Sequence, residues 1–364
     1  MDVTVHHLLN LGFIAISLVM IRRLQQTQKS PFWLSVGAVT VQSGLLFTVG
    51  AVSALAYPTN NFGRGQLVAW TLFLYNPLLL IGLTAVIHKF NRKIAYGCGA
   101  MAILILLIAL DAFLIEPYWL KVSYVTLPTA KIETPVRIAI LADIQTDAPG
   151  TYEANAIRRT MDAQPDLILF AGDYIHLGKR SRNYEYESAA LNTLLEEAEV
   201  NAPLGAFVVR GNVDPYGEWM RVFEGLPIVA SETRAQFDLG KIHLTTLSLQ
   251  EAFNTATAVS AEEDTFHIVL GHSPNFSLGD VNADLLIAGH THGGQVQLPI
   301  LGPILTLSAV PREWASGVTE IAPGKTLIVS NGIGLERGQA PRLRFLCRPE
   351  VIIVDLVPEV VTQN

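Results

Sequence analysis

The chain has 364 residues, half of them hydrophobic and only 16% charged, which is an apolar composition for a soluble protein. Residues 1–121 hold eight Lys or Arg and three Asp or Glu, whereas residues 122–364 hold 17 and 29. The acidic second part argues against a nucleic-acid partner, because phosphate backbones bind basic surfaces. Cys98 and Cys347 lie in different parts, which disfavours a disulfide.

Four apolar stretches predict that residues 1–121 form a transmembrane region of about four helices. A helix needs about 20 residues to cross the hydrocarbon core, and the last three stretches reach that length. The first is interrupted by His6, His7 and Asn10, and a signal peptide is its alternative, disfavoured because Asp2 replaces the usual basic start. The stretches cover residues 3–21, 32–57, 67–87 and 94–120.

Basic residues in the connecting loops predict the orientation, since such loops stay in the cytoplasm. The second loop has only Arg64, whereas the first and third each have three basic residues. The N-terminus and the part after residue 120 are therefore expected outside, and this orientation reverses if the first stretch does not span. The basic residues of the first and third loops are Arg22, Arg23, Lys29, Lys89, Arg92 and Lys93.

Asp111 lies within the fourth stretch, where a carboxylate can mark a transport path. The alternative is that Asp111 and Glu116 lie near the outer interface. The other spans carry no second charged residue, so we expect the region to anchor the protein.

A linker over residues 122–135 is expected to lead into an α/β domain over residues 136–364. Short β-branched runs, each closed by turn residues, predict buried strands. Residues 151–163 and 184–200 have the pattern of surface helices, and the alternation of strands and helices predicts a layered architecture. The expected strands cover residues 136–142, 167–171, 206–209, 266–270, 285–288, 327–329 and 351–356.

Five of these strands end in side chains that can bind metal. Ligands in open α/β sheets bind at the carboxyl ends of strands, so these side chains are expected to converge. They are Asp143, Gln145, Asp173, Asn212, His272, His290 and His292.

Oxygen and imidazole donors together suit Mn²⁺, Mg²⁺, Fe²⁺ or Zn²⁺. Seven donors fit two ions that share a bridging carboxylate, and ions about 3.5–4 Å apart can hold a phosphoryl group and activate water. A single Gly-Asp or Gly-Asn is weak evidence, because both are common in turns. Five such elements in order, each after a strand, predict a two-metal site.

The series Asp143-x-Gln145, Gly172-Asp173, Gly211-Asn212-Val-Asp214, Gly271-His272 and Gly289-His290-Thr-His292 resembles the calcineurin-like metallophosphoesterases, over residues 136 to about 356. "GHTHGGQVQLP" and the tail from "VSNGIG" to "RLRFLCRPEVIIVDL" are similar to the bacterial membrane-associated branch, some members of which carry N-terminal transmembrane helices. The resemblance implies a four-layer α/β/β/α sandwich with two metal ions.

The resemblance also implies how the ligands divide. Asp143, Gln145, Asp173 and His292 would hold one ion, and Asp173, Asn212, His272 and His290 the other, with Asp173 bridging. Catalytic roles would fall to Asp173, Asn212 and His272, and Asp214 would orient its neighbours.

Two positions depart from the family pattern. The family usually has His where Gln145 stands, and a neutral amide oxygen favours Mn²⁺ over softer ions, with Fe, Zn or Mg as alternatives. The other interpretation of Gln145 is a decayed metal site. Val213 replaces a histidine that assists the leaving group. An alkoxide needs such an acid, whereas a phosphate or another leaving group of low pKa does not, and we therefore expect cleavage of a phosphodiester or pyrophosphate bond over that of a simple monoester.

His176 could replace the missing acid, although an exposed loop histidine is the favoured interpretation. His243 and His267 lie within strands, where packing explains them. One of four arginines near the C-terminal turns could hold a substrate phosphate, with a solvated surface position as the alternative for each. These arginines are Arg312, Arg337, Arg342 and Arg344.

The sequence therefore predicts a membrane-anchored, metal-dependent phosphoesterase of the bacterial inner membrane, with its catalytic domain outside the cytoplasm. The lipid bilayer is one expected partner. Because the anchor places the site beside the bilayer, a lipid-linked substrate similar to UDP-2,3-diacylglucosamine is a candidate. Such nucleotide-linked lipids are made on the cytoplasmic side, which conflicts with the orientation expected from charge. The alternatives are a membrane scaffold or sensor with a degenerate metal site, and a transporter that depends on Asp111.

Overall fold

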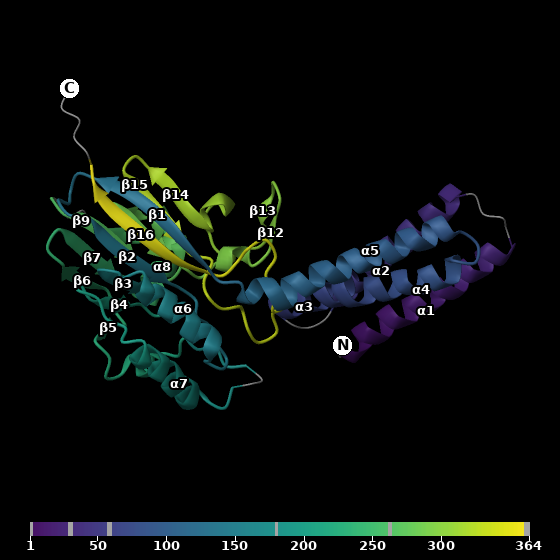
Figure 1. Ribbon diagram of the computed structural model, residues 1–364, viewed down its shortest axis with the longest axis horizontal. Coiled ribbons are helices and arrows are strands. Elements are labelled where there is room, and N and C mark those ends of the chain that lie inside the picture. The colour runs from purple at the N-terminus through teal and green to yellow at the C-terminus, as the bar shows by residue number, and fades with distance from the viewer. Residues whose placement is uncertain (1–2, 28–31, 57–59, 179–180, 261–263, 360–364) are drawn as a thin grey trace, which may run out of the picture. The chain divides into compact units, whose positions relative to one another are not determined.

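The computed structural model describes residues 3–27, 32–56, 60–178, 181–260 and 264–359 (Figure 1). The chain forms two compact units, which are Met1–Leu114 with Gln339–Pro341 and Ile115–Gly338 with Arg342–Asn364. Lys29, one of the basic residues used for the orientation, lies outside the described residues.

The first unit contains four helices that are long and apolar enough to cross a membrane. The first candidate span is full length, and the third begins at Asn61, six residues before the predicted start. The third span is continuous through a π-helical segment, and the fourth ends in another. The elements are α1 (Val3–Thr27), α2 (Phe32–Leu55), α3 (Asn61–Trp70), η1 (Thr71–Tyr75), α4 (Asn76–Ile87), α5 (Arg92–Leu110) and η2 (Asp111–Ile115).

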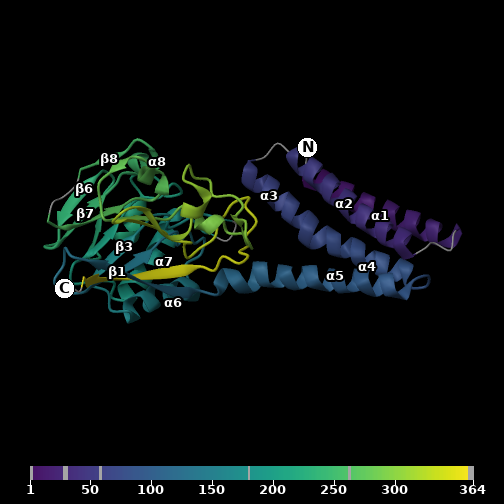
Figure 2. The same ribbon diagram turned by 90° about the horizontal axis from the view of Figure 1, so that it is seen from above.

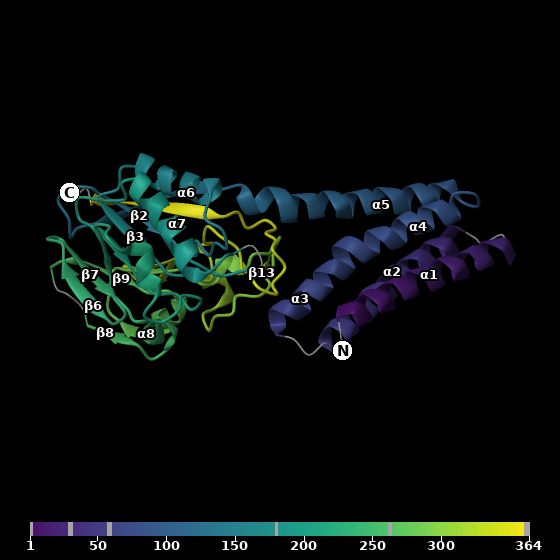
Figure 3. The same ribbon diagram turned by 90° about the horizontal axis from the view of Figure 1, so that it is seen from below.

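Asparagines begin the last two spans. The Asn60 side chain accepts a hydrogen bond from the Gly63 amide at 2.8 Å, and Asn91 accepts one from the Ile94 amide at 3.3 Å. Each bond satisfies an amide that has no partner within the first helical turn. α4 and α5 lie side by side near the turn that joins them, whereas α3 diverges from α5 (Figures 2 and 3).

The second unit begins with the short 3-10 helix η3 (Glu116–Tyr118) and contains two six-stranded sheets. The first has the order β1-β16-β2-β3-β4-β5, in which β2 to β5 are parallel. Its strands are β1 (Lys121–Thr129), β2 (Val136–Leu141), β3 (Leu167–Phe170), β4 (Ala206–Val208), β5 (Ile228–Ala230) and β16 (Glu350–Pro358).

The second sheet has the order β14-β15-β11-β9-β7-β6, with four parallel central strands and antiparallel strands at both edges. Its strands are β6 (Ala235–Asp238), β7 (Ile242–Thr246), β9 (Phe266–Leu270), β11 (Leu285–Ala288), β14 (Gly317–Ala322) and β15 (Lys325–Val329). Two-residue ladders join β8 (Ala258–Val259) to β10 (Asp280–Val281) and β12 (Gln297–Leu298) to β13 (Gly302–Pro303).

These sheets form the inner layers of the predicted four-layer α/β/β/α sandwich. Alternate residues of the central strands point between the sheets, where Ile140, Leu169 and Ile268 are completely buried. The opposite face of the first sheet packs against α6 (Thr151–Asp162) and α7 (Tyr184–Glu197) (Figure 1). The fourth layer is thin, with α8 (Leu249–Phe253) and η5 (Pro274–Leu278) beside the second sheet.

The seven predicted strands and both predicted helices are present in the second unit. The linker predicted over residues 122–135 is wrong for most of its length, because β1 pairs with β16 over nine residues. Leu127 faces the core, whereas Tyr124, Thr126 and Pro128 face solvent. An edge strand of this kind has no continuous apolar run, which is why the sequence pattern did not reveal it.

Candidate metal centre

The predicted ligands lie at the carboxyl ends of strands from both sheets. Asp143, Gln145, Asp173 and Asn212 follow β2, β3 and β4 of the first sheet, and the three histidines follow β9 and β11 of the second. Parallel strands present their carboxyl ends at one edge, so the two packed sheets bring both sets of loops together.

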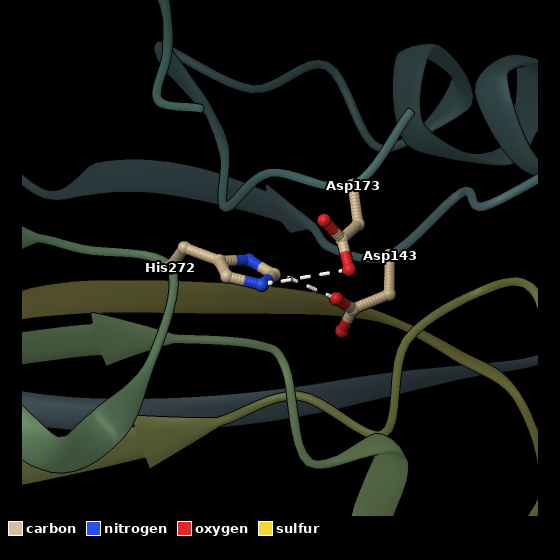
Figure 4. Close-up of side chains that lie close together, drawn as sticks. All are labelled: Asp143, Asp173 and His272. Carbon is tan, nitrogen blue, oxygen red and sulfur yellow. Dashed lines mark ion pairs between the residues drawn. The ribbon is translucent and has the colours of Figure 1, made fainter. Parts of the chain in front are cut away.

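Asp143, Asp173 and His272 form the centre of this cluster (Figure 4). One ligand atom from each lies within 4.8 Å of the others, and all three residues are buried. Nε2 of His272 lies 3.5 Å from Oδ2 of Asp173, and Nδ1 of His272 lies 3.9 Å from Oδ1 of Asp143. The Asp143 carboxylate also accepts a hydrogen bond from the His290 amide at 3.0 Å, which joins the two sheets at the site.

The backbone at the site is held in an uncommon conformation. Five of the seven predicted ligands have positive φ, between 39° and 68°. This region costs an ordinary residue roughly 1–3 kcal/mol, and such residues gather at functional sites. The five are Asp143, Gln145, Asp173, His290 and His292.

Hydrogen bonding leaves Nε2 of His272 available as a ligand. Nδ1 lies 2.7 Å from the Ala171 carbonyl oxygen, so the proton belongs on Nδ1 and the lone pair on Nε2. Nε2 then faces two oxygen atoms, Oδ1 of Asn212 at 2.9 Å and Oδ2 of Asp173 at 3.5 Å. These three atoms each present a lone pair, and no proton lies between them to form a hydrogen bond. Such an arrangement is suited to binding a cation.

The other two histidines are also neutral donors. Nε2 of His290 lies 3.3 Å from the Leu307 carbonyl oxygen, which leaves Nδ1 with the lone pair. Both ring nitrogens of His292 are buried without a hydrogen-bond partner among the described residues. Because an unsatisfied buried polar group costs roughly 1–3 kcal/mol, a ligand for His292 would relieve a real penalty.

Gln145 presents its amide oxygen to the site. Its nitrogen donates to Nδ1 of His176 and to Oε2 of Glu336, both at 3.1 Å, whereas its buried oxygen has no partner in the described part of the chain. His176 is therefore half-buried beside a predicted ligand, and the favoured interpretation of an exposed loop histidine is wrong. Burial lowers the pKa of His176 to about 4, which suits an acceptor that orients Gln145.

Asp214 supports the site through backbone amides. Its carboxylate accepts hydrogen bonds from the amides of Asp173 at 2.9 Å, Tyr174 at 2.8 Å and Gly211 at 2.8 Å. Asp214 thereby fixes the loop after β3 against the loop after β4. Gly211 allows this approach, because a Cβ there would overlap the carboxylate and amide of Asp173.

Comparison with known proteins identifies the family. A family model described as calcineurin-like phosphoesterase matches residues 136–294. The metallophosphoesterase YkuE of Bacillus subtilis is 32% identical over 209 residues, which cover 54% of this chain and 69% of YkuE. The chain belongs to the calcineurin-like phosphoesterase family.

Two further relatives match a larger share of the chain. A metallophosphoesterase of Aquifex aeolicus is 28% identical over 269 residues, covering 66% of this chain and 94% of the relative. The phosphodiesterase YaeI of Escherichia coli is 28% identical over 257 residues, covering 66% and 90%. This calcineurin-like phosphoesterase is thus a metal-dependent hydrolase of phosphoric esters.

The two divalent ions that the family implies fit the electrostatics of the site. Burial, followed by the nearby charge of Asp173, raises the pKa of Asp143, and burial raises the pKa of Asp173 to about 7. Burial lowers the pKa of His272 to about 4 and of His290 to about 3, and it also lowers that of His292. Neutral imidazoles beside buried acids are the donor set that a divalent cation requires.

The loop after β15 supports this phosphoesterase site and was not singled out in the sequence. The amide of Gly334 donates to the Asp143 carbonyl at 2.7 Å, and Glu336 in the same loop orients Gln145. Ser330 and Asn331 directly after a buried strand mark a sixth polar strand end, a signal that could have revealed this loop.

The arginines divide between the core and the surface. Arg344 is completely buried and donates to the carbonyls of Asn331, Gly332, Gly334 and Cys347, so the solvated position considered for it is wrong. Arg337 is also buried and donates to the Gln145 carbonyl at 2.8 Å. Arg312 is exposed, whereas Arg342 is partly exposed and donates to Asp147 at 2.7 Å. Cys98 and Cys347 are free thiols.

Proposed function

We propose that this protein is a membrane-anchored phosphoesterase that uses two metal ions, Mn²⁺ in preference to Fe, Zn or Mg, to hydrolyse a phosphodiester or pyrophosphate bond. Its substrate is a lipid-linked phosphate ester or diphosphate at the membrane surface; a nucleotide-linked lipid such as UDP-2,3-diacylglucosamine would require the catalytic unit to face the cytoplasm. The observation that carries the proposal is the cluster of Asp143, Asp173 and His272, surrounded by the free donor atoms of Gln145 and His292.

The donor set supports the choice of metal and the ligand roles. Asp143, Gln145, Asp173 and His292 would hold one ion, and Asp173, Asn212, His272 and His290 the other. When bound, such ions polarise a phosphoryl group and lower the pKa of water. The chain keeps the donors in place, because Ala171 fixes the His272 ring and Glu336 fixes the Gln145 amide.

Val213 supports the choice of bond. It stands where the family pattern has a histidine, its amide donates to Asp173 at 2.9 Å, and its isopropyl group cannot supply a proton. A leaving group of low pKa, such as a phosphate, does not require one. The relative YaeI is named as a phosphodiesterase, which agrees with this choice.

The proposal is tested with the full chain in detergent by comparing Mn²⁺-dependent hydrolysis of bis-p-nitrophenyl phosphate and p-nitrophenyl phosphate. We expect diester cleavage to exceed monoester cleavage. Asp173→Ala removes the bridging carboxylate and is expected to lower the rate by about a thousandfold or more, as expected when a charge-stabilising group is lost. Asp280→Ala, an exposed aspartate of β10, is the matched control.

Preference for the monoester would contradict the proposed choice of a diester bond. Absence of hydrolysis together with stoichiometric manganese would contradict the proposed substrate class, whereas absence of both would favour the scaffold. Equal activity of the Asp173→Ala variant would contradict the metal assignment itself.

Four apolar helices support a location in the bacterial inner membrane. Basic first and third loops support an outside position for the second unit. A C-terminal alkaline phosphatase fusion, active only outside the cytoplasm, should therefore be active. Activity of a C-terminal green fluorescent protein fusion in its place would reverse the orientation.

A further inference from the structure

The first unit contains an apolar cavity of about 370 Å³ between its third and fourth spans. Its volume falls in the range of about 300–1,000 Å³ found for small-molecule sites. α3 diverges from α5 (Figures 2 and 3). Side chains of α3, η1, α5 and η2 line the cavity. The lining residues are Ala69, Trp70, Phe73, Leu74, Leu106, Ala109, Leu110, Phe113 and Leu114, which we call the groove.

Both walls of the groove contain a π-helical segment. Phe73 and Leu74 belong to η1, and Phe113 and Leu114 belong to η2. These are the two π-helical segments of the described residues, and both contribute to the same cavity. Such segments add a residue to a helical turn and are frequent at functional sites.

Packed aromatic rings close the inner side of the groove, and its other side is open. The Phe73 and Phe113 rings meet edge to face with centroids 5.5 Å apart, which joins the two spans. The Trp70 ring stacks on His7 of α1 with centroids 4.9 Å apart, which limits its movement. On the open side, Leu74, Leu110 and Leu114 are 48%, 45% and 65% exposed.

The depth of the groove along the spans indicates which kind of molecule can occupy it. Consecutive spans run in opposite directions, so Asn61 and Tyr118 end on the same side of the membrane. At 1.5 Å per residue, the lining residues lie about 6–20 Å from those ends. Each span has 27 residues and is about 40 Å long, so the lining residues lie in the half of the spans nearest those ends. Most of that half borders the hydrocarbon core, where an acyl chain is the available apolar ligand.

We propose that the groove seats one acyl chain of the substrate, an assignment that rests on the proposed hydrolysis of a lipid-linked phosphate ester. Leu114, which lines the groove, is followed directly by Ile115, where the chain continues into the second unit, so the groove and the catalytic unit are adjacent along the chain. An acyl chain enters laterally from the bilayer past the exposed leucines. Its retention in the groove restricts where the attached phosphate can lie.

The test uses two chromogenic diesters that differ only in chain length, p-nitrophenyl hexadecyl phosphate and p-nitrophenyl ethyl phosphate. Both lose p-nitrophenolate to water, so the ratio of their kcat/KM values isolates the contribution of the chain. The full protein is assayed with Mn²⁺ in phosphatidylcholine liposomes. We expect the wild-type protein to favour the hexadecyl ester, and Ala109→Phe to lower this ratio by about tenfold to a hundredfold, as expected for a displaced substrate.

Matched variants keep the result interpretable. Ala100→Phe introduces the same side chain at an exposed position of α5 outside the groove and should keep the wild-type ratio. Leu110→Trp enlarges an exposed side chain at the rim and should lower the ratio without overpacking a buried position. A variant that folds poorly loses both rates together, which leaves the ratio unchanged.

Each outcome separates this inference from the function on which it rests. An unchanged ratio in both groove variants that still hydrolyse the ethyl ester at the wild-type rate, or an equal decrease in Ala100→Phe, would overturn the groove, while hydrolysis of the ethyl ester upholds the phosphoesterase. Absence of Mn²⁺-dependent hydrolysis of either ester would contradict the proposed function itself. As a readout independent of activity, a hexadecyl phosphate with a terminal diazirine should label residues 69–74 and 106–114, and uniform labelling of all four spans would overturn the groove.

Discussion

Gln145 shows how a neutral side chain can be held in position to bind a metal ion. An amide has nearly equivalent ends, and only its oxygen can bind a cation. Here the nitrogen donates to His176 and Glu336, so the oxygen points into the site. The departure from the family's histidine is therefore accompanied by residues that fix the amide, which argues against a decayed site.

Glu336→Ala should weaken metal binding without removing a ligand. The amide of Gln145 loses the acceptor at 3.1 Å that holds its nitrogen outward. Loss of a partner that orients a ligand typically costs 10–100-fold in metal affinity, so we expect the Mn²⁺ concentration for half-maximal activity to rise by about that factor. Activity at saturating Mn²⁺ should largely return.

Manganese titration of hydrolysis measures this effect, with Glu313→Ala as the control at an exposed glutamate. An unaltered titration curve for Glu336→Ala would mean that His176 alone holds the amide. A rate that stays low at all Mn²⁺ concentrations would instead give Glu336 a direct part in the chemistry.

At the scale of elements, most central strands were predictable and the sheet edges were not. Five strands of the two large sheets are missing from the expected strand list, and four of them, β1, β5, β6 and β14, are the sheet edges. The fifth is the central strand β7, of which the sequence placed only His243 within a strand. β14 alternates partly buried and exposed residues, and β6 follows the same pattern. Central parallel strands are buried on both faces and produce continuous apolar runs, whereas edge strands do not.

The site residues divide in the same way. His272 and His290 directly follow runs that read as strands, so their convergence could be predicted from the sequence. Glu336 and Arg344 act through loops that are brought to the site only by the paired sheets. Asp214 was predicted to orient its neighbours, and its carboxylate accepts three hydrogen bonds from backbone amides that hold the two loops in place.

Gly211→Ala should disrupt the packing of the loop after β3 against the loop after β4. The added Cβ would overlap the carboxylate and amide of Asp173, and neither can move without breaking its bonds to Val213 or Asp214. Overpacking of this kind typically costs about 1–3 kcal/mol, so a lower unfolding temperature and loss of bound manganese are expected.

Thermal unfolding and metal analysis of the purified protein test this expectation. Gly150→Ala is the matched control, because the nearest atom to its added Cβ is the Ala148 oxygen at 3.9 Å. Normal manganese content in Gly211→Ala would show that the two loops can separate without loss of the site.

At the scale of the molecule, the metal centre joins the two sheets at one edge. The first sheet supplies both buried carboxylates, and the second supplies three imidazoles whose pKa values are lowered by burial. The apolar layer between the sheets is completed by residues such as Ile140 and Ile268. The edge at the site, in contrast, is polar and buried, so its stability depends on a partner for the buried carboxylates and imidazoles.

Removal of metal should therefore lower the unfolding temperature of the second unit. An ion that binds only the folded state stabilises it by about 2.7 kcal/mol at a concentration 100 times its Kd. For a unit of this size, about 2–4 °C per kcal/mol is expected, so chelation should lower the midpoint by roughly 5–10 °C. Tryptophan emission can follow this transition, since Trp219 is buried against Tyr174 with ring centroids 5.8 Å apart. Mn²⁺ should restore the midpoint in the wild-type protein and have little effect on Asp173→Ala, whereas equal midpoints with and without Mn²⁺ would show that the buried donors are satisfied without a metal ion.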